Sequence, residues 1–157
     1  MPPEVLAREA ARRKLAFGLQ AGLIATLLMT GLLVAAPLLA GWRTSQAAAQ
    51  TIAQLRAHPL IALAALAAHL TYGAAAGALF TVGARAINVT RGALYGLGLW
   101  GVAAAIYAPL VGLGFVASHQ PALAAVALPL HVAYGVALGA FAPRGEIVQP
   151  LDAAASA

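Results

Sequence analysis

Four apolar runs, each long enough to cross a lipid bilayer, dominate this sequence. About 20 apolar residues in a helix span the ~30 Å hydrocarbon core of a membrane. Within that core a helix satisfies all of its own backbone hydrogen bonds. The sequence therefore predicts an all-α fold, a four-transmembrane-helix bundle that forms one integral membrane domain over residues 1–157. The predicted spans are about 15–41, 59–84, 92–117 and 121–142.

Composition agrees with this class of protein. Hydrophobic residues make up 62% of the chain and charged residues 8%, and the mean hydropathy is +0.88. These values lie outside the range of soluble domains. The chain has no cysteine, which excludes disulfides and thiolate metal sites. Its net charge of +5 comes from basic residues at the ends of the apolar runs. We therefore expect lipid headgroups of the bilayer as their partners, and no nucleic acid.

The positions of Lys and Arg predict the orientation in the membrane. Four precede the first span, two lie between the second and third spans, and one follows the fourth. On the other side there are two, Arg43 and Arg56, both between the first and second spans. Loops on the cytoplasmic side carry the excess of positive charge, so we expect both termini in the cytoplasm (N-in and C-in). For a bacterial chain this membrane is the cytoplasmic, or inner, membrane.

The first apolar run has to be distinguished from a cleaved signal peptide. It is about 26 residues long, whereas the apolar core of a signal peptide has roughly 7–15. We therefore expect an uncleaved anchor, preceded by a short surface helix at residues 2–14. In the loop after this span, Gln46, Gln50 and Gln54 recur every four residues. This spacing predicts an interfacial helix on the outer surface.

One motif, His-x-x-Tyr-Gly-x-x-x-Gly, occurs twice at an offset of 62 residues. It reads HLTYGAAAG at 69–77 and HVAYGVALG at 131–139. Each copy follows a proline, Pro59 or Pro121, at the same distance. Such a match in register indicates an internal repeat, a duplicated helical hairpin. The second and fourth spans run in the same direction, so the repeats are parallel and their symmetry axis lies along the membrane normal.

The first and third spans match more weakly than the second and fourth. APLL at 36–39 aligns with APLV at 108–111, at an offset of 72 residues. The loop after the first span therefore looks like a ten-residue insertion. We expect repeat 1 to cover about 15–85 and repeat 2 about 88–145.

Within each motif, the four named residues fall on one face of a helix, about 140° wide. The histidines lie about 15 Å beyond their prolines, close to the middle of the bilayer. A Gly-x-x-x-Gly pair lets two helix backbones approach closely. The motif faces are therefore predicted to look into the bundle, with helix-packing residues Gly73, Gly77, Gly135, Gly139, Tyr72 and Tyr134. The first span adds a row of small residues at Gly18, Gly22, Thr26 and Thr30.

His69 and His131 allow two interpretations. In the first they are structural, neutral imidazoles that hydrogen-bond a backbone carbonyl or Tyr72, Tyr134, Thr71 or Trp100. In the second they are the two axial ligands of a b-type haem. Two features oppose the haem: the neighbouring glycines bring backbones together, and no arginine lies at membrane depth to pair with propionates. Two histidines alone are an incomplete zinc site.

Enzyme chemistry finds little support in the sequence. All four carboxylates lie outside the spans, which leaves no acidic group for a proton or sodium relay. No serine is placed to form a Ser–His–Asp triad at membrane depth. There is no phosphate-binding glycine loop and no His-Glu-x-x-His motif. We therefore expect a protein that is not an enzyme.

The stretches AGLIATLLMTGLLVAAPLL, HLTYGAAAGALF, RGALYGLGLW and LPLHVAYGVALGAF suit four membrane helices. They resemble the spans of small bacterial inner-membrane proteins of the YagU-like type, over most of residues 18–142. The resemblance implies four helices in the cytoplasmic membrane. That group has no established reaction, so the resemblance assigns no functional residue.

Together these features lead to an expectation about function. We expect a non-enzymatic accessory or assembly subunit that packs through its small-residue faces, in a homo-oligomer or a larger membrane complex. One alternative is an electron-transfer module with a b-type haem between His69 and His131. A second alternative is a small-molecule transporter or channel, in which the polar layer at mid-membrane is the binding site.

Overall fold

The structure, a computed structural model, describes residues 2–39, 57–84 and 86–141. Within these ranges it is helical and contains no strand. Its elements are α1 (Pro3–Leu39), α3 (Pro59–Gly83), α4 (Val89–Val102), the π-helix η1 (Ala103–Tyr107), α5 (Ala108–Leu110), the 3₁₀-helix η2 (Phe115–Ala117) and α6 (Pro121–Phe141). Four helical segments are long and apolar enough to cross a membrane, by length and composition. The predicted all-α, four-span architecture is confirmed at this level.

Two predicted boundaries differ from the structure. The surface helix expected at 2–14 is not separate, because α1 is one continuous helix of 37 residues. The third span runs over Val89–Leu110 instead of about 92–117. It ends early because Gly112 and Gly114 have φ of 80° and 77°, a left-handed conformation that terminates the helix. The predicted interfacial helix with Gln46, Gln50 and Gln54 lies outside the described residues.

Prolines and one cap define several helix ends. Pro59 and Pro121 occupy the first position of α3 and α6, where the missing backbone N–H removes no helical hydrogen bond. At the start of α4, the side chain of Asn88 accepts a hydrogen bond of 2.9 Å from the backbone N–H of Arg91. These residues mark where α3, α4 and α6 begin.

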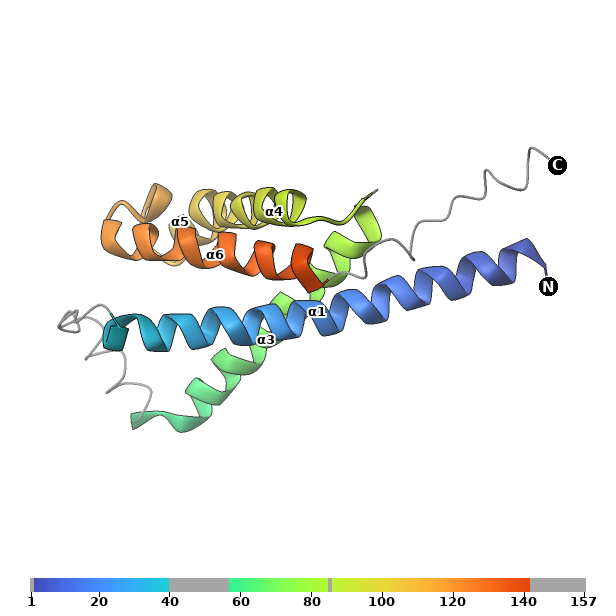
Figure 1. The fold of residues 1–157 in the computed structure, drawn as a ribbon. Coiled ribbons are helices and arrows are strands. Elements are labelled where there is room, and N and C mark those ends of the chain that lie inside the picture. The colour runs from blue at the N-terminus through green and yellow to red at the C-terminus, as the bar shows by residue number, and fades with distance from the viewer. Residues whose placement is uncertain (1, 40–56, 85, 142–157) are drawn as a thin grey trace.

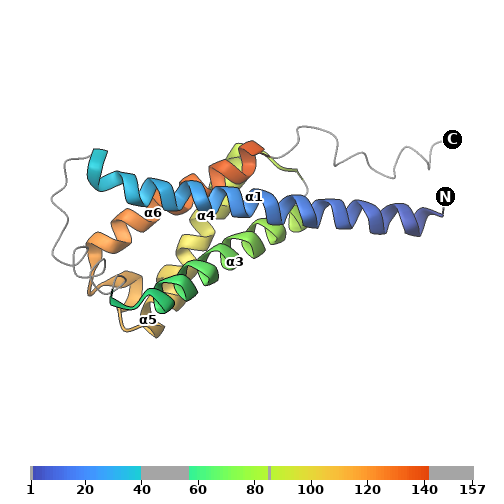
Figure 2. The ribbon, with the colours of Figure 1, turned by 90° about the horizontal axis from the view of Figure 1, so that it is seen from below.

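The helices lie side by side in the order α3, α1, α6, α4 (Figure 1). The most extensive contacts join α1 to α3 and α4 to α6, and a smaller contact joins α1 to α6. The molecule thus consists of two helical hairpins, α1–α3 and α4–α6, that meet along α1 and α6. α3 crosses α1 and diverges from it toward Pro59, as both ribbon views show (Figures 1 and 2).

α1 is longer than a bilayer requires. At 1.5 Å per residue its 37 residues extend about 55 Å. Its N-terminal part, which carries Arg8, Arg12 and Arg13, projects beyond the other helices and is exposed (Figures 1 and 2). The basic side chains of this part suit the headgroup region and the water beside a membrane.

The core fills one half of the bundle, at the end where α3 finishes and α4 begins. We call this the Gly83 end, and the opposite end, where α5 finishes, the Leu110 end. Six buried residues form the core cluster, which Phe17, Tyr95, Leu99 and others border: Ala21, Ala25, Ala76, Phe80, Tyr134 and Leu138. The rings of Phe80 and Tyr95 are 5.0 Å apart, and the Tyr95 hydroxyl donates to the Ala76 carbonyl at 2.7 Å. The hairpins are therefore well packed at the Gly83 end.

Candidate functional site

Glycines hold the first hairpin together. Gly18 and Gly22 of α1 lie directly against the backbone of α3 at Gly73, Gly77 and Ala78. A Cβ atom added to Gly77 would lie 2.5 Å from the Cα of Gly22, which is closer than real Cβ atoms approach. Only glycine therefore allows the two backbones to pack this closely.

The second hairpin is closed in the same way. Gly92 and Gly96 of α4 lie against α6 at Gly135 and Gly139. A Cβ atom on Gly135 would lie 2.9 Å from the backbone nitrogen of Gly96, and overlaps with Gly92 as well. Each hairpin thus has its own glycine seam, a name that we use for these two sets of backbone contacts.

The two seams have matching registers. Gly22 lies against Gly73 and Gly77, just as Gly92 lies against Gly135 and Gly139. Gly22 and Gly92 are 70 residues apart, whereas the APLL and APLV stretches gave an offset of 72. The π-helix η1 follows Gly96 and adds one residue to the helical register, which accounts for half of this difference.

In both seams, the glycines contact a helix of the same chain. The glycines that sequence analysis assigned to helix packing contact the partner helix of their own hairpin, and no other molecule is needed to cover them. Gly31, Gly83, Gly98 and Gly101 are the described helical glycines at which an added Cβ would meet open space. The seam glycines are therefore covered by helices of the chain itself.

A cavity of about 720 Å³ lies between the two hairpins. It is partly open and its walls are mainly apolar. α1 contributes Thr26 and Met29, and the third span contributes residues from Leu99 to Leu110. The polar side chains of the lining, from all four spans, are Thr26, His69, Tyr72, Tyr107, His131 and Tyr134. This inter-hairpin cavity lies on the Leu110 side of the core cluster, where α3 diverges from the other helices.

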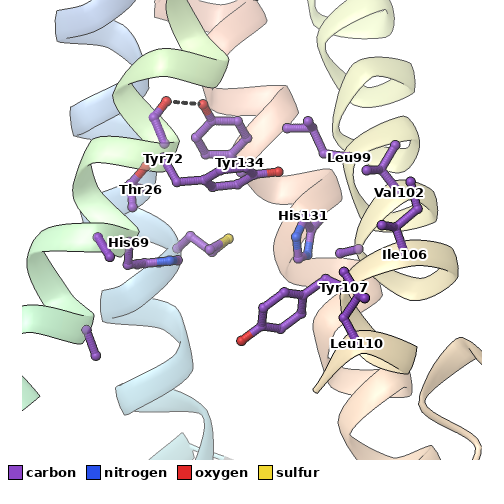
Figure 3. A pocket seen from close by; sticks show the side chains of 15 residues that line it. Thr26, His69, Tyr72, Leu99, Val102, Ile106, Tyr107, Leu110, His131 and Tyr134 are labelled. Carbon is purple, nitrogen blue, oxygen red and sulfur yellow. Dashed lines mark hydrogen bonds between the residues drawn. The ribbon is translucent and has the colours of Figure 1, made fainter. Parts of the chain in front are cut away.

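The two motif histidines face this cavity from opposite walls. His69 comes from α3 and His131 from α6, and both rings are directed into the space between them (Figure 3). Tyr72 and Tyr134 lie toward one end of the cavity and Tyr107 toward the other (Figure 3). The structure therefore brings together the two residues that the repeat singled out, at one site.

Their hydrogen bonding agrees with the sequence expectation for His131, which bonds a backbone carbonyl, and differs from it for His69. The Nδ1 atom of His131 lies 2.8 Å from the carbonyl oxygen of Ala127, one turn earlier in its own helix. No hydrogen bond to the ring of His69 occurs within the described residues. The expected bonds to tyrosine, Thr71 or Trp100 are not formed: the hydroxyl of Thr71 donates to the Ala67 carbonyl, and Trp100 does not line the cavity.

The motif tyrosines also have different surroundings. Tyr134 is 4% exposed, and its hydroxyl donates a 2.6 Å hydrogen bond to the Gly73 carbonyl, which links α6 to α3 (Figure 3). Tyr72 is 49% exposed and reaches from α3 across the cavity. The bond from Tyr134 therefore ties the two hairpins together at the floor of the cavity.

Sequence analysis missed the irregular wall that α4 and α5 contribute. Residues Ala103–Tyr107 form a π-helix, in which the backbone N–H of Ala108 bonds to the Ala103 carbonyl, five residues back. Pro109 gives the physical reason, because it lacks an N–H and its ring would clash with the carbonyl four residues earlier. Ala103, Ile106 and Tyr107 of this segment line the cavity. Pro109 was the available signal in the sequence, and π-helical turns are frequent at functional sites.

Within the described part of the chain, no group of three or more His, Cys, Asp or Glu side chains is placed to hold a metal ion. Comparison with protein-family models, with curated proteins and with solved structures finds no match to this chain. The interpretation of the site therefore depends on its own geometry and chemistry.

Proposed function

We propose that this chain is a multi-pass protein of the bacterial cytoplasmic membrane, built by duplication of a helical hairpin, with both termini in the cytoplasm. The excess of Lys and Arg on one side of the spans supports this orientation. The matching registers of the two glycine seams support the duplication. A relationship to the YagU-like proteins is part of the same proposal.

The proposed orientation can be tested with single cysteines, because the chain has none of its own. Ala86 and Ser118 are exposed and lie at opposite ends of the bundle. A membrane-impermeant maleimide applied to intact spheroplasts is expected to label Ser118→Cys. Ala86→Cys is expected to react only after lysis. The reverse pattern would place both termini outside.

Within this membrane, we propose that the protein is a non-enzymatic binding protein for a lipophilic molecule, held in the inter-hairpin cavity. The observation that carries this proposal is the cavity itself, which side chains of all four spans line. Its size falls within the range of small-molecule sites, about 300–1,000 Å³, and such sites combine apolar walls with a few polar groups. The two histidines and three tyrosines are those polar groups.

The position of the cavity favours a ligand that enters from the bilayer. α3 makes extensive contact with α1 but little with α4, so no helix among residues 2–39, 57–84 and 86–141 covers the cavity on that side. Val102, Ile106, Tyr107 and Leu110, which line it, are also exposed large apolar residues. Toward the Gly83 end the core cluster closes the space. A pocket with one closed end suits binding better than passage through the membrane, the alternative of a transporter or channel.

Photolabelling tests this function directly. A small apolar aryl diazirine, dissolved in the membrane and activated by light, is expected to label the segment of α6 that contains His131 and Tyr134. Tyr134 is buried and His131 half-buried, so labelling there reports entry into the cavity. Mass spectrometry of the labelled peptides locates the modification.

A matched pair of variants on α3 makes the labelling experiment decisive. Ala64 and Ala68 are both exposed on this helix, but only Ala68 lines the cavity. Ala68→Phe is expected to fill the cavity and to suppress labelling of α6, and Ala64→Phe is expected to leave it unchanged. Equal labelling in both variants would contradict the proposed function.

A further inference from the structure

Each of the two cavity histidines has at least one ring nitrogen without a hydrogen-bond partner among the described residues. A carbonyl oxygen only accepts hydrogen bonds, so the bond between Nδ1 of His131 and Ala127 places the proton on Nδ1. The other nitrogen, Nε2, then carries a free lone pair. This arrangement, with one ring N–H bonded to a backbone carbonyl, is the one that orients a histidine as an iron or zinc ligand.

His69 supplies the second donor on the opposite wall. Its ring is half-buried in a mainly apolar cavity and has no hydrogen-bond partner within the described residues. Leaving a polar group unpaired in apolar surroundings costs free energy. A ligand that accepts the lone pair of each imidazole would remove this cost on both walls.

The number and positions of the metal-ligating side chains distinguish a site for a bare metal ion from a site for a haem. Zinc takes four protein ligands in structural sites and three in catalytic ones, and the described residues place no third His, Cys, Asp or Glu beside these two. A six-coordinate haem iron takes two axial ligands, one on each face of a flat and mostly apolar ring. Two imidazoles on opposite walls of an apolar cavity meet that requirement.

The backbone around the histidines leaves room for such a ring. The glycine seams draw α1 to α3 and α4 to α6, and not α3 to α6, so they do not close the space between His69 and His131. This removes the objection that neighbouring glycines raise against a haem. Small side chains, Ala65, Ala68 and Ala103, form part of the wall, and the π-helix makes the opposite side irregular.

We propose that the inter-hairpin cavity binds one b-type haem, with Nε2 of His131 and a ring nitrogen of His69 as axial ligands. This inference rests on the proposed ligand-binding function of the cavity and names the ligand. The core cluster closes the Gly83 end, so the propionates point toward the Leu110 end. There the loop after α5 offers the exposed polar side chains Ser118 and Gln120.

Titration of the purified, detergent-solubilised protein with haemin tests this inference. The wild type is expected to bind one haemin per chain and to give the absorption spectrum of six-coordinate, low-spin iron. His69→Ala and His131→Ala are each expected to give a five-coordinate, high-spin spectrum and to weaken binding by about tenfold or more. Added imidazole is expected to restore the low-spin spectrum in each variant, which shows that the variants remain folded.

The other two histidines provide matched controls. His58 and His119 are exposed at the Leu110 end and do not line the cavity. His58→Ala and His119→Ala are expected to retain the wild-type spectrum. The inference is overturned if the wild type shows only the spectrum of haemin in empty micelles, or if His69→Ala and His131→Ala behave as the wild type.

The outcome can be separated from that of the proposed function. If the diazirine labels α6 in a manner that Ala68→Phe suppresses, but haemin gives no low-spin complex, the cavity binds a lipophilic molecule of another kind and the haem inference is wrong. If neither experiment shows binding in the cavity, both proposals are wrong.

Discussion

The two copies of the His-x-x-Tyr-Gly-x-x-x-Gly motif, on α3 and on α6, agree in their glycines and differ in their polar residues. Gly77 and Gly139 both meet the backbone of the preceding span. By contrast, Tyr134 is buried and bonded to Gly73, whereas Tyr72 is half exposed in the cavity. His131 is held by Ala127, and His69 has no such partner among the described residues. One pattern therefore serves packing in both copies, while its polar positions have separate roles.

The reason for this difference is geometric. The glycines face inward to their own hairpin, and each hairpin has the same register. The histidines and tyrosines face the other hairpin, and α3 and α6 stand differently there, because α6 contacts α1 as well as α4 whereas α3 contacts mainly α1. The side chains of α6 are thus enclosed and those of α3 border open space.

Substitution of the seam glycines is expected to have the largest effect, equal in both copies. Gly77→Ala and Gly139→Ala each place a methyl group against backbone atoms, which cannot move aside as a side chain can. Each variant is expected to lose about 3 kcal/mol of stability, the upper range for overpacking. Unfolding by SDS titration from mixed micelles, followed by circular dichroism, measures the loss.

Gly98→Ala is the control for this prediction, because a Cβ atom there meets open space. It is expected to leave the stability unchanged or to raise it, since alanine favours the helix. If only one of the variants Gly77→Ala and Gly139→Ala loses stability, the glycines, too, have different roles in the two copies.

Removal of the motif hydroxyls is expected to have an intermediate effect that separates the copies. Tyr134→Phe breaks the bond to the Gly73 carbonyl and is expected to cost about 1 kcal/mol, within the range measured for hydrogen bonds in membrane proteins. Tyr72→Phe is expected to cost nothing measurable. The same SDS titration serves here, and similar losses in the two variants would contradict the asymmetry.

The smallest expected effect concerns the histidines in the ligand-free protein. His69→Leu removes an imidazole that has no partner within the described part of the chain, so stability is expected to stay the same or to rise by a few tenths of a kcal/mol. His131→Leu is expected to lower stability by a similar amount, about 0.6 kcal/mol at most, because it breaks the bond to Ala127. A loss at His69 equal to that at His131 would indicate a hidden partner for His69.

The sequence predicted the parts of this fold that depend on local pattern. The apolar runs located four spans, and Pro59 and Pro121 marked the starts of two of them. The sequence did not predict the early end of the third span at Leu110 or the continuity of α1. A basic stretch such as Arg8–Lys14 ends the hydrophobic signal without ending the helix.

The arrangement of the site depended on contacts that no local pattern encodes. The repeat pointed to His69 and His131, and both line one cavity. The pattern did not show that the glycines close the hairpins and leave the space between them open, since that depends on which helix each face meets. The contribution of Tyr107 depends on the π-helix before Pro109, a local irregularity that hydrophobic periodicity does not reveal.

The most direct test of this account measures whether residues 69 and 131 face each other across one cavity. In His69→Cys/His131→Cys, with a nitroxide label on each cysteine, the electron paramagnetic resonance spectrum is expected to show strong dipolar broadening. The two singly labelled proteins provide the reference spectra without broadening. A doubly labelled spectrum equal to the sum of the single ones would mean that the two side chains lie far apart, and would contradict the shared cavity.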